Sequence, residues 1–150
     1  MTLEDELGIA KFRSVQQRAA LNILFTSNWI EQKNSECFKV FGISQEQFNV
    51  LRILKGQKGK PANLSTIEER MIHRMSNATR LVEKLKIKGY VQRKICEDNR
   101  RKIEITITDK GLQLLELIDP KLTQSESDLF KNLTAKEAKA IGLLLDKLRS

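Results

Sequence analysis

The chain has 150 residues, a length typical of one domain, and its 27 lysines and arginines against 19 acids give a net charge of +8. Hydrophobic residues make up 40% of it and no low-complexity tract interrupts them, which excludes a disordered chain. Its apolar runs are far shorter than the roughly 20 residues that a transmembrane helix needs. The acidic start lacks the features of a signal peptide, so we expect a cytoplasmic protein with reduced cysteines and no membrane partner.

The positive charge is concentrated in one segment of the chain. Residues 70–102 contain eleven lysines and arginines but only three acids. The other 117 residues carry 16 charges of each sign, so the entire excess lies in this segment. Such a local surplus predicts a binding site for a polyanion.

The first predicted element is a long helix over residues 3–41. Apolar residues recur there at steps of three and four on two faces, and no proline interrupts them. If this helix is broken, the break is expected near Asn34 and Ser35. The apolar area of its two faces is larger than one domain can cover, which predicts a partner chain.

Three shorter helices are predicted next. Capping boxes at 44–47 and 65–68 begin the first two, which end near residues 56 and 71. The third spans 76–88, and Gly89 is its expected C-terminal stop.

The spacing of hydrophobic residues then changes from the helical repeat to strict alternation. Residues 91–95 and 102–107 are predicted as the strands of a β-hairpin, since three isoleucines alternate with polar residues in the second. Thr108 caps the next predicted helix, which Pro120 is expected to kink or end, and a capping box at 134–137 begins the last. The order predicts a mainly α fold with a small β-hairpin (α+β), a winged helix-turn-helix flanked by long helices.

The outer face of the helix at 76–88 has residue types that suit the DNA major groove. Arginine can bind guanine through paired donors, asparagine can bind adenine, and serine or threonine can bind either. A charged outer face is also ordinary for a solvated helix, so this helix alone does not decide the function. The candidate DNA-binding residues on it and just before it are Arg74, Ser76, Asn77, Thr79, Arg80 and Lys84.

The predicted hairpin turn adds a second basic element. This turn contains three adjacent cations, in the run Asn99, Arg100, Arg101 and Lys102. The cations repel one another unless a phosphate or a narrow DNA groove binds them. A neutral hairpin would more commonly have Asn-Gly or Asp-Gly at this place. The two basic elements together favour DNA binding over simple solvation.

Four segments of the chain, 47–51, 76–85, 88–93 and 99–111, share their residue pattern with a known family. The last of them reads Asn-Arg-Arg-x-Ile-x-Ile-x-Ile-Thr-x-x-Gly. With these segments the chain resembles the multiple-antibiotic-resistance regulator (MarR) family of bacterial transcription factors, over nearly its whole length.

The resemblance implies a homodimer that binds a pseudo-palindromic operator in double-stranded DNA, as a ligand-responsive repressor. It divides the chain into an N-terminal dimerisation helix (1–41), a winged helix-turn-helix domain (42–111) and C-terminal dimerisation helices (112–150). Arg101 matches the family's wing-tip arginine, which enters the minor groove. Asn99 stands where the family usually has aspartate, so a carboxylate that fixes this arginine would come from Asp98 or is absent.

Family members often bind a small aromatic or phenolic effector between the dimer helices and the DNA-binding lobe. Phe12, Trp29 and His73 are the candidate pocket residues. Core packing of the two aromatic residues and a local hydrogen bond of the histidine are the competing interpretations.

Two other classes of function remain as alternatives. A winged helix can also bind RNA or protein, although the basic segment has only Tyr90 as a stacking aromatic. Cys37 or Cys96 could make the chain a thiol-based redox regulator. An enzyme is not expected, since the sequence has a single histidine, no glycine-rich phosphate loop, no metal-ligand spacing and no nucleophile motif, and no cofactor is implied.

Overall fold

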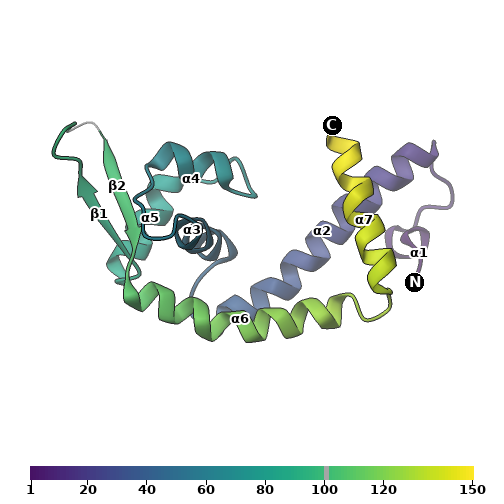
Figure 1. Ribbon diagram of the computed structural model, residues 1–150. Coiled ribbons are helices and arrows are strands. Elements are labelled where there is room, and N and C mark those ends of the chain that lie inside the picture. The colour runs from purple at the N-terminus through teal and green to yellow at the C-terminus, as the bar shows by residue number, and fades with distance from the viewer. Residues whose placement is uncertain (100–101) are drawn as a thin grey trace.

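Two long helices, α2 and α6, extend from a helical lobe that carries a β-hairpin. They connect this lobe to the N- and C-terminal ends of the chain (Figure 1). The computed structural model describes residues 1–99 and 102–150. Its elements are α1 (Leu3–Leu7), α2 (Val15–Lys39), α3 (Gln45–Gly56), α4 (Leu64–Arg70), α5 (Ala78–Ile87), β1 (Val91–Ile95), β2 (Ile103–Ile107), α6 (Asp109–Leu129) and α7 (Ala135–Arg149). This order confirms the predicted mainly α fold with a two-stranded hairpin.

The hydrophobic core lies in the lobe. Leu51 of α3, Ile67 of α4, Leu85 of α5 and Ile105 of β2 are completely buried together. A pair of backbone hydrogen bonds between Ala62 and Ile105 joins the segment before α4 to the hairpin. The lobe therefore holds α5 rigidly against α3, α4 and the hairpin.

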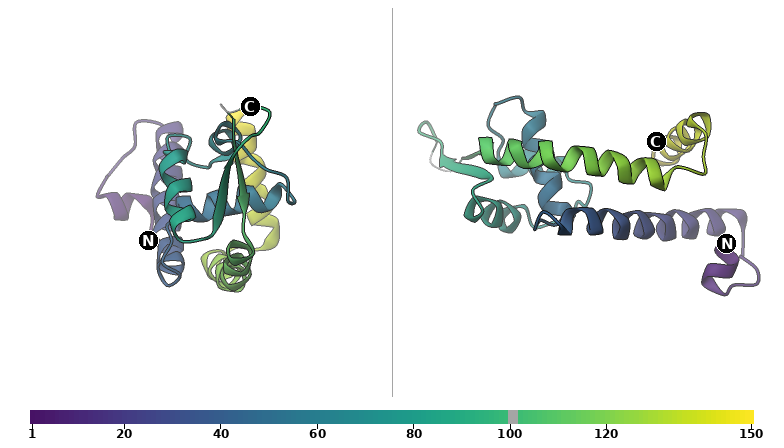
Figure 2. Two further views of the ribbon diagram at one scale, coloured as in Figure 1. Left: turned by 90° about the vertical axis from the view of Figure 1, so that its left-hand side faces the viewer. Right: turned by 90° about the horizontal axis from the view of Figure 1, so that it is seen from below.

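The far end of the molecule lacks such a core. Figure 2 shows α2 and α6 running away from the lobe beside each other, with α1 and α7 at their far ends. Within the described residues, Phe38 is the one buried residue of α2, and α7 has none. The large apolar side chains that these helices expose include Ile23, Leu24, Trp29, Ile141, Leu143, Leu144 and Leu148. A single chain leaves this apolar surface uncovered.

The N-terminal helix differs from the prediction of one helix over residues 3–41. Gly8 has a left-handed φ of 63° and ends α1, and the Ser14 hydroxyl accepts a hydrogen bond from the Gln17 amide and begins α2. Asn34 and Ser35, the expected place of a break, lie inside α2. Glycine adopts the left-handed conformation without steric cost, which is why the chain turns at residue 8.

Two predicted helix starts are also corrected. Asn63, not Ser65, is the N-cap of α4, because its Oδ1 accepts the hydrogen bond from the Thr66 amide at 2.7 Å. Likewise α5 begins at Ala78, not at residue 76, because Asn77 is its cap.

Pro120 does not end α6, which was one of the two predicted outcomes. The helix runs from Asp109 to Leu129 with Pro120 inside it, on an exposed position. Glu116, whose carbonyl loses its helical partner at Pro120, is exposed as well, so water can satisfy this carbonyl. The predicted caps Ser44, Thr108 and Thr134 are confirmed.

The start of α6 packs closely against the residue before β1. A Cβ atom added at Gly111 would lie 2.4 Å from the Tyr90 carbonyl oxygen and 2.7 Å from Cγ1 of Ile107. The Thr108 hydroxyl fixes this junction, since it donates to the Gly89 carbonyl at 2.7 Å and accepts from the Gly111 amide at 3.1 Å. Glycine is the residue that permits this approach.

Replacing Gly111 with alanine is therefore expected to lower the free energy of unfolding by about 1–3 kcal/mol, because the added methyl group overlaps backbone that cannot move freely. Urea unfolding at one protein concentration, followed by circular dichroism, measures the change. Gly56→Ala is the control, since a Cβ there meets no described atom within 4 Å and the helix gains propensity. Equal stability of Gly111→Ala and the unmodified chain would contradict the close contact.

Candidate nucleic-acid interface

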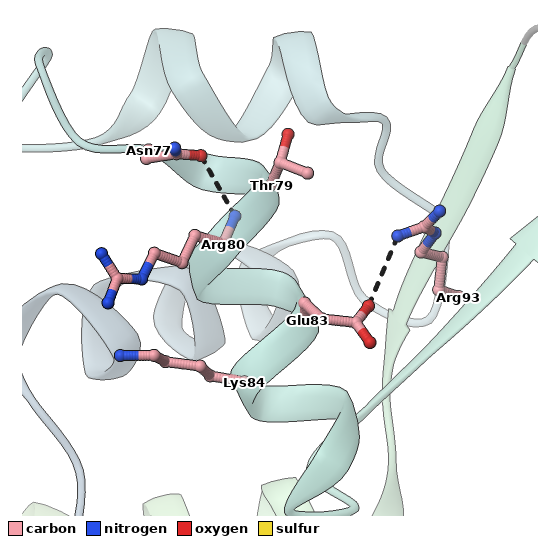
Figure 3. A pocket seen from close by; sticks show the side chains of 6 residues that line it. All are labelled: Asn77, Thr79, Arg80, Glu83, Lys84 and Arg93. Atoms are coloured by element: carbon pink, nitrogen blue, oxygen red, sulfur yellow. Dashed lines mark hydrogen bonds and ion pairs between the residues drawn. The ribbon is translucent and has the colours of Figure 1, made fainter.

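Helix α5 exposes a polar surface that forms a shallow groove with strand β1. Figure 3 shows Arg80 and Lys84 extending to one side of α5, while Glu83 points the other way, toward Arg93 of β1. The apolar residues Ala78, Val82 and Leu85 of the same helix face the core and are buried. The amphipathic pattern that predicted an outward polar face is thus present in the structure.

The side chain of Asn77 caps the N-terminus of α5. Its Oδ1 accepts a hydrogen bond from the Arg80 backbone amide at 3.1 Å (Figure 3). A paired contact with adenine uses both the oxygen and the nitrogen of an asparagine side chain. In this conformation one lone pair of Oδ1 is engaged by the backbone, so Asn77 can offer a ligand its amide nitrogen as a donor and the second lone pair of Oδ1 as an acceptor.

An ion pair links α5 to the hairpin. The Arg93 Nη1 atom lies 3.5 Å from Oε2 of Glu83, and both side chains are partly exposed. Arg93 offsets the one acid of α5, so the net positive charge of this helix comes from Arg80, Lys84 and Lys86. The ion pair also fixes the orientation of the hairpin relative to α5, a contact that sequence reasoning missed because the two residues belong to different elements.

The turn before α5 is held by two long-range contacts. The Ile72 amide donates to Oδ1 of Asn49 on α3 at 2.9 Å, and His73 Nε2 lies 2.7 Å from Oε1 of Glu31 on α2. Arg74, a predicted DNA-binding residue, is exposed in this turn, whereas Ser76 is half-buried. The turn thus presents Arg74 beside the N-terminus of α5.

Besides Arg93, two more cations of the basic segment have partners inside the protein. The Lys88 ammonium donates to the Gly42 carbonyl, and the Arg70 guanidinium donates to Oε1 of Gln57 at 2.7 Å. These contacts fasten the ends of α5 and α4 to neighbouring segments. The exposed cations of the described part of this segment that make none of these contacts are Arg74, Arg80, Lys84, Lys86, Lys94 and Lys102. Of these, Arg80 and Lys84 line the groove.

The hairpin connection is described on both sides of its tip. The Lys102 amide donates to the Asn99 carbonyl, and the Cys96 amide donates to the Lys102 carbonyl, each at 2.9 Å. Asn99 and Lys102 are exposed. Arg100 and Arg101, the central predicted residues of the wing, lie outside the described residues.

The three candidate effector residues are not brought together in one cavity of the chain. Phe12 lies before α2, with the Arg18 guanidinium carbon 6.0 Å from its ring centre. His73 contacts Glu31 of α2, a long-range partner where the competing interpretation expected a local hydrogen bond. Trp29 instead lines a cavity of about 550 Å³ between α2 and α6.

This cavity was not predicted, because its two walls are some ninety residues apart in the sequence. Basic and acidic side chains surround it together with Trp29 and Cys37, and its lining includes Lys33, Glu36, Lys121, Gln124, Asp128 and Lys131. Burial raises the pKa of the Cys37 thiol, an effect that the charge of Lys121 opposes. A raised pKa keeps the thiol protonated at neutral pH, which disfavours the redox interpretation for Cys37.

Among residues 1–99 and 102–150, no helix is long and apolar enough to cross a membrane. The same residues contain no group of three histidine, cysteine, aspartate or glutamate side chains arranged to hold a metal ion.

Comparison with known proteins gives consistent matches. Residues 43–103, which span the lobe, match the family model described as the MarR family. PapX, an HTH-type transcriptional regulator of Escherichia coli, is 26% identical over 119 residues, which cover 79% of this chain and 73% of PapX.

Two solved structures show the same fold at 20% sequence identity. A mutant MarR of Escherichia coli complexed with operator DNA matches with a TM-score of 0.77 over 99% of each chain. Bordetella bronchiseptica BpsR, whose DNA binding is regulated by 6-hydroxynicotinic acid, matches with a TM-score of 0.81 over 93% of this chain and 99% of BpsR.

Proposed function

We propose that the chain, whose residues 43–103 match the MarR family model, is a transcriptional regulator of this family that binds double-stranded operator DNA as a homodimer. Family members are regulators of transcription and not enzymes. The observation that carries the proposal is the outer face of α5, where Arg80 and Lys84 extend together from a rigid lobe (Figure 3).

In the proposed complex, α5 lies in the major groove and the hairpin connection reaches the adjacent minor groove. The N-terminal residues of a recognition helix contact base edges in this motif, which assigns that role to Thr79 and Arg80 and to the amide of Asn77. Arg74 and Lys84 neutralise phosphates, and residues 99–102 form the wing. Residues 42–111 act as the DNA-binding domain in this arrangement.

The homodimer is supported by the apolar surface at the far end of the molecule. Helix α7 exposes Leu144 and Leu148 at 65% and 67%, and α2 exposes Leu24 at 66%. A second copy that presents the same helices would cover these side chains, as expected of an isologous interface. Residues 1–41 and 112–150 are thus assigned to dimerisation.

We also propose that DNA binding represses transcription and responds to a small aromatic effector. Support comes from BpsR, whose DNA binding 6-hydroxynicotinic acid regulates. In this chain, the cavity between α2 and α6 offers the indole of Trp29 and the ammonium groups of Lys33 and Lys121 to an aromatic anion. An effector that prefers one dimer arrangement would shift the spacing of the two α5 helices.

Binding to duplex DNA across a salt series tests the proposal. Duplexes selected by the protein from a random library are expected to contain an inverted repeat and to lose affinity as salt rises, with a slope of log K against log salt of about −0.9 per phosphate contact. The Lys84→Ala variant is expected to reduce that slope by about one for each half-site, because Lys84 is assigned to a phosphate. A slope near zero, or no selected duplex, would contradict DNA binding.

A further inference from the structure

The turn that leads into α5 carries an exposed apolar side chain at its tip. The Ser76 amide donates to the His73 carbonyl at 3.1 Å, so Arg74 and Met75 are the two central residues of this turn. Met75 is 97% exposed, the highest value among the large apolar side chains of the described residues. A single exposed apolar side chain is ordinary on a protein surface, so what matters for Met75 is its place in the turn and its charged neighbours.

The base of the turn is fixed, so its tip has a defined position. Asn49 of α3 accepts from the Ile72 amide at 2.9 Å, and Glu31 of α2 lies 2.7 Å from His73. One contact holds the backbone of Ile72 and the other holds the side chain of His73, so the α4 side of the turn is tied to two different helices and its backbone needs less ordering when a ligand covers the tip. The turn is preorganised for contact.

The charges near Met75 restrict the kind of partner that can cover it. Arg74 is its neighbour in the turn, and Arg80 lies in the first turn of α5, which begins three residues after Met75. A partner that packs on Met75 must also accommodate these cations, which favours a polyanion. On the base edges of the major groove, the apolar group is the 5-methyl of thymine.

We propose that Met75 reads thymine, by packing against its 5-methyl group in the major groove next to the bases approached by Arg80. The unbranched and polarisable methionine side chain adapts to such a contact. This inference rests on the proposed function, since it assigns a base preference within the same DNA interface. It adds a base-reading residue outside α5, in the turn that precedes it.

Replacing thymine with deoxyuridine tests this contact, because the substitution removes only the methyl group. The probe is the duplex that the full-length protein selects from a random library, with deoxyuridine placed at each thymine position in turn. The unmodified protein is expected to lose about fourfold in affinity at one or two positions of each half-site. Met75→Ala is expected to bind the thymine and deoxyuridine duplexes equally at those positions, whereas Met75→Leu keeps the difference.

Ile87→Ala is the matched control. Ile87 is also apolar and 77% exposed between lysines, but it lies at the opposite end of α5, so this variant is expected to retain the fourfold loss. If deoxyuridine changes no affinity, or changes it equally for Met75→Ala, the thymine contact is overturned while DNA binding stands. If no duplex is selected at all, the proposed function fails and this inference with it.

Discussion

A variant with aspartate at both Leu144 and Leu148 is expected to be a monomer with the lobe still folded. Both side chains are about two-thirds exposed in the protomer, so their replacement leaves the core of the lobe intact. In the proposed dimer, two copies of the variant would bury four unpaired carboxylates, each at a cost of several kcal/mol. The dissociation constant of the dimer should therefore rise by at least about a thousandfold.

Light scattering coupled to gel filtration measures this change, and DNA binding provides a second measurement. A monomer contacts one half-site, so its affinity for the inverted repeat should fall by about 10²–10⁴, the usual gain from linking two binding modules. Lys139→Asp is the control, because it also adds an aspartate to α7 but on the face opposite Leu144. A dimer that persists in the double variant would show that α7 is not part of the interface.

Replacing Arg80 with alanine is expected to cause the largest loss of specific DNA binding. The guanidinium can make a paired contact with guanine, which contributes about 1–3 kcal/mol of discrimination for each base pair. Because a dimer has two copies, affinity for the selected duplex should fall by about a hundredfold or more. Affinity for unrelated duplexes should fall much less, and competition binding with both kinds of duplex measures the difference.

Arg80→Lys separates base reading from charge. Lysine keeps the positive charge but loses the planar, paired donors, so this variant should bind unrelated duplexes normally and the selected duplex poorly. If Arg80→Lys binds every duplex like the unmodified protein, Arg80 contacts a phosphate and not a base.

Local sequence signals predicted most of the fold. The caps at Ser44, Thr108 and Thr134 are correct because each depends on residues at most three positions apart. The start of α4 was mispredicted because both Asn63 and Ser65 are good caps. The backbone pairing of Ala62 with Ile105 ties down the chain just before Asn63, and this pairing depends on tertiary structure.

The sequence predicted the polar outer face of α5 but not the geometry around it, and the DNA-binding role of its residues stays a prediction. The amphipathic pattern around Arg80 and Lys84 identified the outer face of α5. The contacts that hold this face in place, from Glu31 to His73 and from Asn49 to Ile72, join residues of separate elements. No periodicity or motif reports such contacts, and for the same reason Met75 received no role from the sequence.

The absence of buried residues in α7, within the described chain, has a consequence for how the protein folds. A helix of 15 residues is marginally stable in water by itself, so in the proposed homodimer α7 would depend on the second copy for its structure. Folding of this end is then coupled to association, and the temperature at which it melts rises with protein concentration. A cell that makes few copies would thus hold fewer complete regulators than its number of chains suggests.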